Sequence, residues 1–301
     1  MKAFCKFAYR VITLFGILVF AASCSPAGSR NADRNNPAQE SAGEDEEAAD
    51  LAEAIARLSR DDTEVAAEGV LAQTLAAAEI PGDLSRRIVN SAVESPGFIL
   101  ELLACLEGDP FLYRLADKQH GLPDGYEPED LVELKGGSYQ INRQGLLLRA
   151  AAARALETMA AAARAEGVTL IVSSAYRSHE YQAEVYARNV RESGRDTADR
   201  ESARPGYSQH QMGLAVDFGS IDDSFAQTPA GRWILANGSR FGWSLSFPDG
   251  YEAVTGYRWE SWHYRYVGTD LAAFTDAWFG GIQQYALRFI HEWELAFGRD
   301  L

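Results

Sequence analysis

The sequence predicts an α+β fold, with a small antiparallel sheet, flanking helices and an N-terminal helical extension. Two observations lead to this class. Three short apolar or β-branched runs, residues 168–172, 214–218 and 262–267, have the length and pattern of strands. Apolar residues at helical spacing precede and follow them. Because helices and strands do not alternate regularly along the chain, their order is typical of an α+β domain.

The first 23 residues have the composition of a secretory signal peptide. Basic residues give a positive start, and the uncharged apolar run over residues 11–22 is too short for a stable membrane span. Small residues then lead into Cys24, in an arrangement that resembles a bacterial lipobox, where the cysteine is lipidated. We therefore expect an exported protein, lipid-anchored in the bacterial cell envelope on the periplasmic or outer face of a membrane. Plain secretion and an uncleaved anchor are the alternatives, because Ala21 stands where a lipobox usually has Leu.

Two further segments separate this signal from the centre of the chain. Residues 24–50 are rich in small, polar and acidic residues, so they cannot bury apolar surface and predict a disordered acidic tether. Residues 51–106 show helical spacing that is interrupted by Pro and Gly at 81–82 and at 96–97, which predicts an extension of two to four helices. These helices either form a stalk or pack on the domain that follows.

The rest of the chain divides into a central domain and a tail. Residues 107–270 contain the three expected strands and an Ala-rich helix expected over Leu146–Ala165, and residues 271–301 predict one or two C-terminal helices. Cys105 is the only cysteine after Cys24, so no intramolecular disulfide is expected, and a small buried apolar role suits it. The formal net charge of −15 argues against nucleic-acid binding, which needs a basic face.

Two of the expected strands place polar side chains where a metal could bind. On the strand 214–218, Asp217 alternates with apolar neighbours, and His210 precedes it by a Gly-containing turn. On the strand 262–267, His263 lies on the polar face of an aromatic alternation. Two imidazoles and one carboxylate make a suitable set of ligands for one catalytic zinc ion per chain, with a fourth position left for water.

Two more residues complete this candidate site. Glu260 stands three residues before His263, and a carboxylate that does not bind the metal is the natural general base for water activated by zinc. Arg177 follows the strand 168–172, and beside a metal it could clamp a carboxylate. The remaining histidines of the mature chain, His120, His179 and His291, carry no such pattern.

The motifs that hold these residues resemble a known family. Tyr-Arg-Ser at 176–178 with Gln182, Ser-x-His-x-x-Gly-x-Ala-x-Asp at 208–217 and Glu-x-x-His at 260–263 are together similar to the VanY-type D-alanyl-D-alanine carboxypeptidases. That family belongs to a zinc peptidase superfamily with lysostaphin-like and hedgehog-like domains. The resemblance covers about residues 110–270. It implies zinc on His210, Asp217 and His263, a base at Glu260 and a substrate contact or oxyanion contact from Arg177, with Gln182 and Ser208 helping to position the substrate.

The function that follows is zinc-dependent hydrolysis of the terminal D-Ala-D-Ala bond of peptidoglycan stem peptides. Export to the envelope would bring such an enzyme to that substrate. An L,D-carboxypeptidase or a peptidoglycan endopeptidase on the same scaffold remains an alternative, because the residues do not specify which bond is cut. A non-catalytic, zinc-stabilised cell-wall-binding module is a further alternative, although the presence of Glu260 argues against it.

Overall fold

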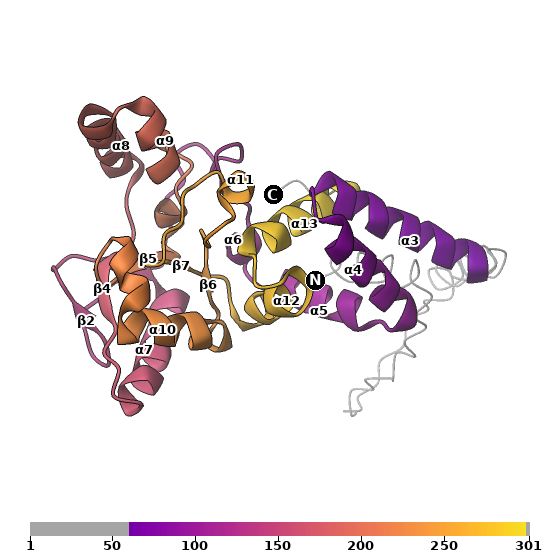
Figure 1. Cartoon of the computed structure of the whole chain (residues 1–301), viewed down its shortest axis with the longest axis horizontal. Helices are drawn as coiled ribbons and strands as arrows, with labels where there is room; N and C mark the ends of the chain where they lie inside the picture. The colour runs from indigo at the N-terminus through magenta and orange to yellow at the C-terminus, as the bar shows by residue number, and fades with distance from the viewer. Residues whose placement is uncertain (1–59, 299–301) are drawn as a thin grey trace, which may run out of the picture.

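The computed structural model describes residues 60–298 (Figure 1). The expected signal peptide over residues 1–23, the lipidation site Cys24, the tether over residues 24–50 and the start of the helical extension lie outside the described residues. Within the described range, the chain forms a sheet unit and a helical unit, which lie side by side in Figure 1.

A five-stranded sheet forms the centre of the sheet unit. Its strand order is β2-β4-β5-β7-β6, and every neighbouring pair is antiparallel except β2 and β4, which run parallel. The strands are β2 (Gln140–Ile141), β4 (Ile171–Ser174), β5 (Ala215–Phe218), β6 (Trp243–Leu245) and β7 (His263–Tyr266). The strands expected over residues 214–218 and 262–267 are therefore confirmed, whereas the strand expected over residues 168–172 begins later, at Ile171, and extends to Ser174. The sheet is mixed at one edge.

A separate two-stranded ribbon precedes the main helix of this unit. Strand β1 (Leu131–Glu133) pairs antiparallel with β3 (Leu147–Arg149), and helix α7 (Ala150–Ala165) follows directly. The expected helix over Leu146–Ala165 is thus wrong at its start. Its first residues are taken into the ribbon because Leu148 is fully buried there opposite Val132.

The alternation of side chains along β5 and β7 separates a core from a polar face. Val216 and Phe218 on β5 pack in one buried cluster with Tyr264 on β7, with α7 and with α10 (Pro229–Asn237). The intervening residues point away from that cluster. Because successive side chains of a strand alternate, the apolar pattern of each strand fixes which residues reach the opposite, polar face.

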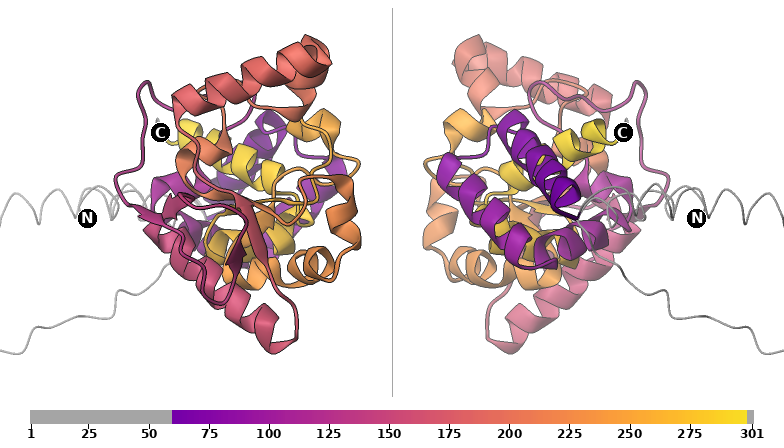
Figure 2. Two further views of the ribbon diagram at one scale, coloured as in Figure 1. Left: turned by 90° about the vertical axis from the view of Figure 1, so that its left-hand side faces the viewer. Right: turned by 90° about the vertical axis from the view of Figure 1, so that its right-hand side faces the viewer.

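The polar face of the sheet lies beneath α8 (His179–Ser193) and α9 (Arg195–Glu201), which Figure 2 shows crossing one end of the unit. Ser178 starts α8 as its N-cap, where its hydroxyl accepts a hydrogen bond from the amide of Tyr181. Short α-helices and 3-10 helices complete the unit. They are α6 (Pro110–Tyr113), η1 (Gln209–Met212), η2 (Asp223–Gln227), η3 (Gly238–Phe241) and α11 (Glu252–Thr255).

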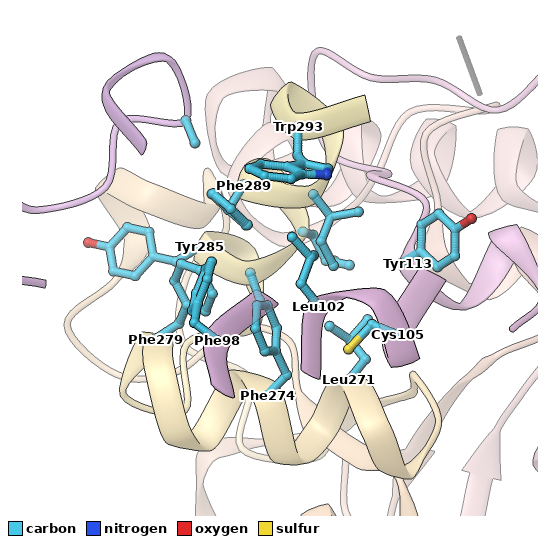
Figure 3. Close-up of a cluster of buried hydrophobic side chains, with 14 of the residues drawn as sticks. Phe98, Leu102, Cys105, Tyr113, Leu271, Phe274, Phe279, Tyr285, Phe289 and Trp293 are labelled. Atoms are coloured by element: carbon cyan, nitrogen blue, oxygen red, sulfur yellow. The ribbon is translucent and has the colours of Figure 1, made fainter. Parts of the chain in front are cut away.

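The helical unit combines the two ends of the described chain. Its helices are α3 (Arg60–Ala77), α4 (Gly82–Glu94), α5 (Gly97–Leu106), α12 (Thr269–Phe279) and α13 (Gln283–Ala296). Aromatic residues of α5, α12 and α13, among them Phe98, Phe274 and Phe289, pack in a second core (Figure 3). The extension therefore packs against the C-terminal helices rather than forming a separate stalk. Cys105 is buried in the same core, as the sequence predicts.

No single helix among residues 60–298 is long and apolar enough to cross a membrane. Helices α4 and α5 satisfy that test only as a pair, across a bend of 103°.

Candidate active site

Four segments bring the candidate site residues to one place on the polar face of the sheet. Arg177 lies in the turn between β4 and α8, His210 lies in η1, Asp217 lies on β5, and His263 begins β7 with Glu260 just before it. Gly213 permits this convergence because it turns the chain from η1 into β5 with φ +65°, and a Cβ there would come within 2.9 Å of the Arg149 and Leu131 side chains.

His210, Asp217 and His263 form a compact buried cluster. Asp217 and His263 are direct cross-strand partners in the β5–β7 ladder. Oδ1 of Asp217 lies 3.2 Å from Nδ1 of His263, and Oδ2 lies 3.3 Å from Nε2 of His210. One candidate ligand atom from each of the three residues lies within 4.8 Å of the others. The structure therefore brings these three residues together.

The outer nitrogen of each imidazole meets a carbonyl oxygen. Nδ1 of His210 lies 2.7 Å from the main-chain oxygen of Ala175, and Nε2 of His263 lies 3.3 Å from Oε1 of Gln209. A carbonyl can only accept, so each of these nitrogens carries the proton. The lone pairs of the two inner nitrogens are then directed toward Asp217. This is the arrangement of histidines that ligate a metal.

The donor set fits a zinc ion. Two imidazole nitrogens and a carboxylate are the ligands of catalytic zinc sites that keep one position open. When His263 is neutral with its proton on Nε2, its Nδ1 presents a lone pair to Oδ1 of Asp217, a buried oxygen that has no hydrogen-bond partner. Two facing lone pairs at this distance repel each other unless a cation lies between them. The described residues therefore form a potential metal site.

Charge in the cluster is consistent with metal binding. Burial, supported by the positive charge of Arg177, lowers the pKa of His210 to about 4, so this imidazole is neutral at physiological pH. Burial alone would raise the pKa of Asp217, but His210, His263 and Arg177 outweigh it and hold that pKa well below its usual range. The site thus presents a neutral His210 and an ionised Asp217, the forms in which these groups bind metals.

Glu260 lies beside the cluster without belonging to it. Its Oε2 is 3.4 Å from Nδ1 of His263, and the side chain is buried. Burial, and then the negative charge of Asp217, raises the pKa of Glu260 well above the usual range. A carboxyl group whose pKa is raised in this way holds a proton more tightly, so it is suited to accept a proton and return it.

Arg177 reaches into the cluster from the opposite side. Its Nη2 donates to Oδ2 of Asp217 at 2.7 Å and lies 3.1 Å from Nε2 of His210. Nε donates to the hydroxyl of Ser174 at 3.2 Å. The guanidinium therefore places its positive charge against the candidate ligands and beside the open cleft.

The two residues expected to position a substrate lie close by. Gln182 is buried, its Oε1 accepts from Nη1 of Arg177 at 3.4 Å, and its Nε2 donates to the Ala203 oxygen at 2.7 Å. Ser208 is buried and caps η1, where its Oγ accepts from the amide of His210. Both residues line the cleft and also support Arg177 or His210.

A cleft of about 710 Å³ opens over the site. One wall is a face of α8 that includes Gln182, Val185 and Asn189, and the other includes Phe247 and Tyr257. The face of α8 extends over three turns, or roughly 15 Å, which is long enough to accompany a short extended peptide. The other histidines lie outside this cleft.

Sequence reasoning missed Gln209 and Ser246. Gln209 stands next to His210 within the recognised motif, so its position carried a signal, but a residue one step from a ligand usually points elsewhere. Ser246 carried no signal, because its contact with Gln209 depends on the packing of the segment after β6.

Comparisons with known proteins agree with this geometry. Residues 145–269 match the family model of VanY, D-alanyl-D-alanine carboxypeptidase. YodJ of Bacillus subtilis, an inferred carboxypeptidase, is 35% identical over 56% of this chain and 65% of its own length. The chain therefore spans slightly less than two thirds of that relative.

Two solved structures are also similar. A mutant of the vancomycin-resistance D,D-pentapeptidase VanY in complex with Zn(II) is 31% identical, covers 59% of this chain and 99% of its own, and superposes with a TM-score of 0.51. The LD-carboxypeptidase LdcB is 32% identical, covers 56% of this chain and 85% of its own, and has a TM-score of 0.50.

The mixed fold, the buried His-Asp-His cluster and the adjacent glutamate are features of a metallopeptidase family. The chain belongs to the VanY D-alanyl-D-alanine carboxypeptidase family.

Proposed function

We propose that this protein is a zinc-dependent D-alanyl-D-alanine carboxypeptidase that removes the terminal D-alanine from peptidoglycan stem peptides. The observation that carries the proposal is the cluster of His210, Asp217 and His263 beneath a cleft, with Glu260 and Arg177 on either side. Family membership and the similarity to a zinc-bound D,D-pentapeptidase support both the metal and the bond that is cut.

Each residue has a role that its surroundings allow. His210, Asp217 and His263 would hold one zinc ion, which supplies Lewis-acid polarisation of the scissile carbonyl and lowers the pKa of a water molecule that it binds. Glu260 accepts the proton of the attacking water at Oε2 and later delivers it to the nitrogen of the departing D-alanine. A divalent cation beside Glu260 would lower its raised pKa toward the range in which it can act as a base at neutral pH.

Arg177 supplies positive charge to the substrate. Its guanidinium lines the cleft within hydrogen-bond distance of the ligand cluster, where it can pair with the substrate carboxylate or with charge developing on the scissile carbonyl oxygen. Gln182 holds Nη1 of this guanidinium, and Ser208 holds the turn that carries His210. Both would also contribute polar contacts to the peptide.

We also propose that the protein acts outside the cytoplasm while attached to a membrane by lipid on Cys24. The basic start, the apolar run and the small residues before Cys24 support export and lipidation. Residues 24–50 would give the domain reach toward the cell wall. The substrate of the proposed reaction is found in that compartment.

A second bond specificity has its own support. The similarity to the LD-carboxypeptidase LdcB favours an L,D-carboxypeptidase as the alternative, with the same ligands and base but a differently configured residue before the cut. An endopeptidase would use the same machinery without needing a free C-terminus.

Digestion of purified muropeptides tests the proposal. The zinc-loaded protein is incubated with pentapeptide and tetrapeptide stems and with crosslinked dimers, and the products are weighed by mass spectrometry. Loss of one alanine from the pentapeptide supports D,D-cleavage. Loss of alanine from the tetrapeptide alone, or separation of dimers alone, would assign the L,D- or endopeptidase activity instead.

A further inference from the structure

A buried chain of polar side chains connects the helical unit to the candidate zinc site. It runs from Gln283, the first residue of α13, through Ser246, which follows β6, to Gln209 and then His263. All four residues are buried, with exposed fractions between 1% and 5%. Polar groups buried to this degree normally serve a specific contact, because leaving them unpaired costs free energy.

Gln209 is the member that contacts the ligand. Its Oε1 lies 3.3 Å from Nε2 of His263 and 2.7 Å from the hydroxyl of Ser246. The imidazole N–H and the hydroxyl therefore both donate to one carbonyl oxygen. The ring of Phe247 packs against the His263 ring with centroids 4.7 Å apart. These contacts hold the imidazole so that Nδ1 faces Asp217 and Glu260.

Gln283 supports this arrangement from α13. Its Nε2 donates to the main-chain oxygen of Ser244 at 3.2 Å. Its Oε1 lies 3.4 Å from the hydroxyl of Ser246, whose one proton is donated to Gln209, so this second contact is a packing contact. The amide of Ser246 in turn donates to the oxygen of His263. The start of α13 thus braces the end of β6, and with it the hydroxyl that orients Gln209. Gln283 lies beyond residues 145–269, which match the family model.

We propose that Gln209 is a positioning residue that fixes the tautomer and orientation of His263, and that α13 contributes to metal affinity through Gln283 and Ser246. The inference rests on the proposed zinc site. On this inference the helical unit takes part in the site, because Gln283, which supports the segment behind His263, lies on α13, a helix of the second core.

Zinc affinity of the full chain, measured by competition with a chromogenic chelator, tests the inference. Gln209→Ala should weaken zinc binding about 10- to 100-fold, the usual effect of losing a partner of a ligating histidine. Gln209→Glu should restore most of the affinity, since its carboxylate still accepts from Nε2. Gln283→Ala should weaken binding by a smaller factor, through the loss of its hydrogen bond to the Ser244 oxygen, which supports the segment that carries Ser246.

Gln284→Ala is the matched control. Gln284 is the next residue of α13, is similarly buried, and donates to Oδ2 of Asp117 at 2.7 Å instead of contacting the chain to His263. Loss of the Gln284 side chain disturbs the docking of α13 but leaves the row of polar side chains that leads to His263 unchanged. Zinc affinity should therefore stay at the wild-type value. Equal weakening by the Gln283 and Gln284 variants would overturn the role of α13, and wild-type affinity in Gln209→Ala would overturn the role of Gln209.

A second measurement separates this inference from the proposed function. In metal-free protein, the ¹⁵N NMR signals of His263, assigned with a His263→Ala variant, should show the proton on Nε2 in wild type and a mixture of tautomers in Gln209→Ala. If wild type binds no zinc, the proposed function fails and this measurement still decides the positioning role. Identical tautomers in both proteins would overturn it.

Discussion

Arg177 and Asp217 form an ion pair in which Nη2 of the guanidinium lies 2.7 Å from a carboxylate oxygen that is also a candidate metal ligand. The positive charge of Arg177 therefore stabilises Asp217 when no metal is bound. The same charge opposes a divalent cation in the neighbouring position. Two effects of removing Arg177 follow, with opposite consequences for metal binding and for catalysis.

Arg177→Ala should retain zinc with an affinity at least equal to that of wild type, because a competing positive charge has been removed. Its kcat/KM on a peptide ending in D-Ala-D-Ala should fall on the order of 100-fold or more, because a charge-assisted contact to the substrate is lost. Chelator competition and steady-state kinetics measure the two effects. Arg177→Lys is the control, since it keeps the positive charge but cannot form the bidentate hydrogen bonds of a guanidinium. Near-normal kinetics in Arg177→Ala would remove the residue from the reaction.

Wild type should also discriminate between a peptide acid and its C-terminal amide. If Arg177 pairs with the free carboxylate, the amide loses that charge and should be cut far more slowly. The measurement is a direct comparison of kcat/KM for the two peptides. Equal cleavage of the acid and the amide would contradict the carboxypeptidase assignment and favour an endopeptidase.

Glu260→Gln should bind zinc normally but lose turnover by about 100- to 10,000-fold, the usual contribution of a general base. The amide has nearly the same shape as the carboxyl group but cannot accept the proton. Zinc content and kcat are measured on the same preparation. A variant that turns over at a rate close to wild type would refute the role of Glu260 as the base, whichever bond is cut.

His263→Ala should lose most of its zinc, whereas wild type purified without added metal should contain close to one equivalent per chain. The variant removes one of three ligands, and two are too few for a stable site. His179→Ala is the matched control, because His179 lies at the start of α8 with an exposed side chain. Elemental analysis measures both. Full zinc content in His263→Ala would exclude this residue from the ligands.

Metal-free Glu260→Gln should be more stable than metal-free wild type, by an amount that grows with pH. Burial raises the pKa of Glu260 well above 4.5, its ordinary value. A group whose pKa is raised by folding contributes stability below its unfolded pKa and loses it as the pH rises, because ionisation is easier in the unfolded chain. Urea unfolding with chelator present at pH 5 and pH 8 measures the effect. A stability difference that is the same at both pH values would contradict it, and added zinc should reduce the difference at pH 8.

Cys24→Ser should abolish incorporation of a fatty-acid analogue and leave the protein either uncleaved or soluble. The reason is chemical, because a lipid anchor of this type requires a thiol. Metabolic labelling followed by membrane fractionation measures the outcome, with Cys105→Ser as the control for a buried cysteine. Labelling that is unchanged in Cys24→Ser would show that the lipobox interpretation is wrong.

The sequence allowed the ligand cluster to be predicted because strand alternation is a local rule. Asp217 among apolar neighbours and His263 among aromatic ones each had to lie on the polar face once the strands were assumed. The two-residue strand β2 and its parallel pairing could not be predicted, since two residues show no periodicity. The start of α7 was missed for a related reason. Leu147–Arg149 has no helix-breaking residue, and only its pairing with β1 makes it a strand.

The docking of the helical extension was also beyond prediction. Helical spacing in residues 51–106 shows that one face is apolar but not what covers it. The structure covers it with α12 and α13, which places Gln283 at the sheet unit. The support of His263 by Gln209 depends on this arrangement of segments that are distant in sequence, so no local pattern could reveal it.

The pairing of Asp217 with His263 across β5 and β7 also bears on how the chain reaches its fold. A slip of one residue in β5 would turn every side chain of that strand to the other face. Asp217 would then enter the apolar cluster around Phe218 and Tyr264, where an unpaired carboxylate is strongly destabilising, and Val216 would face the cleft. The residues that make the site chemically competent therefore also penalise the misaligned sheet, so selection for activity at these positions preserves correct strand alignment as well.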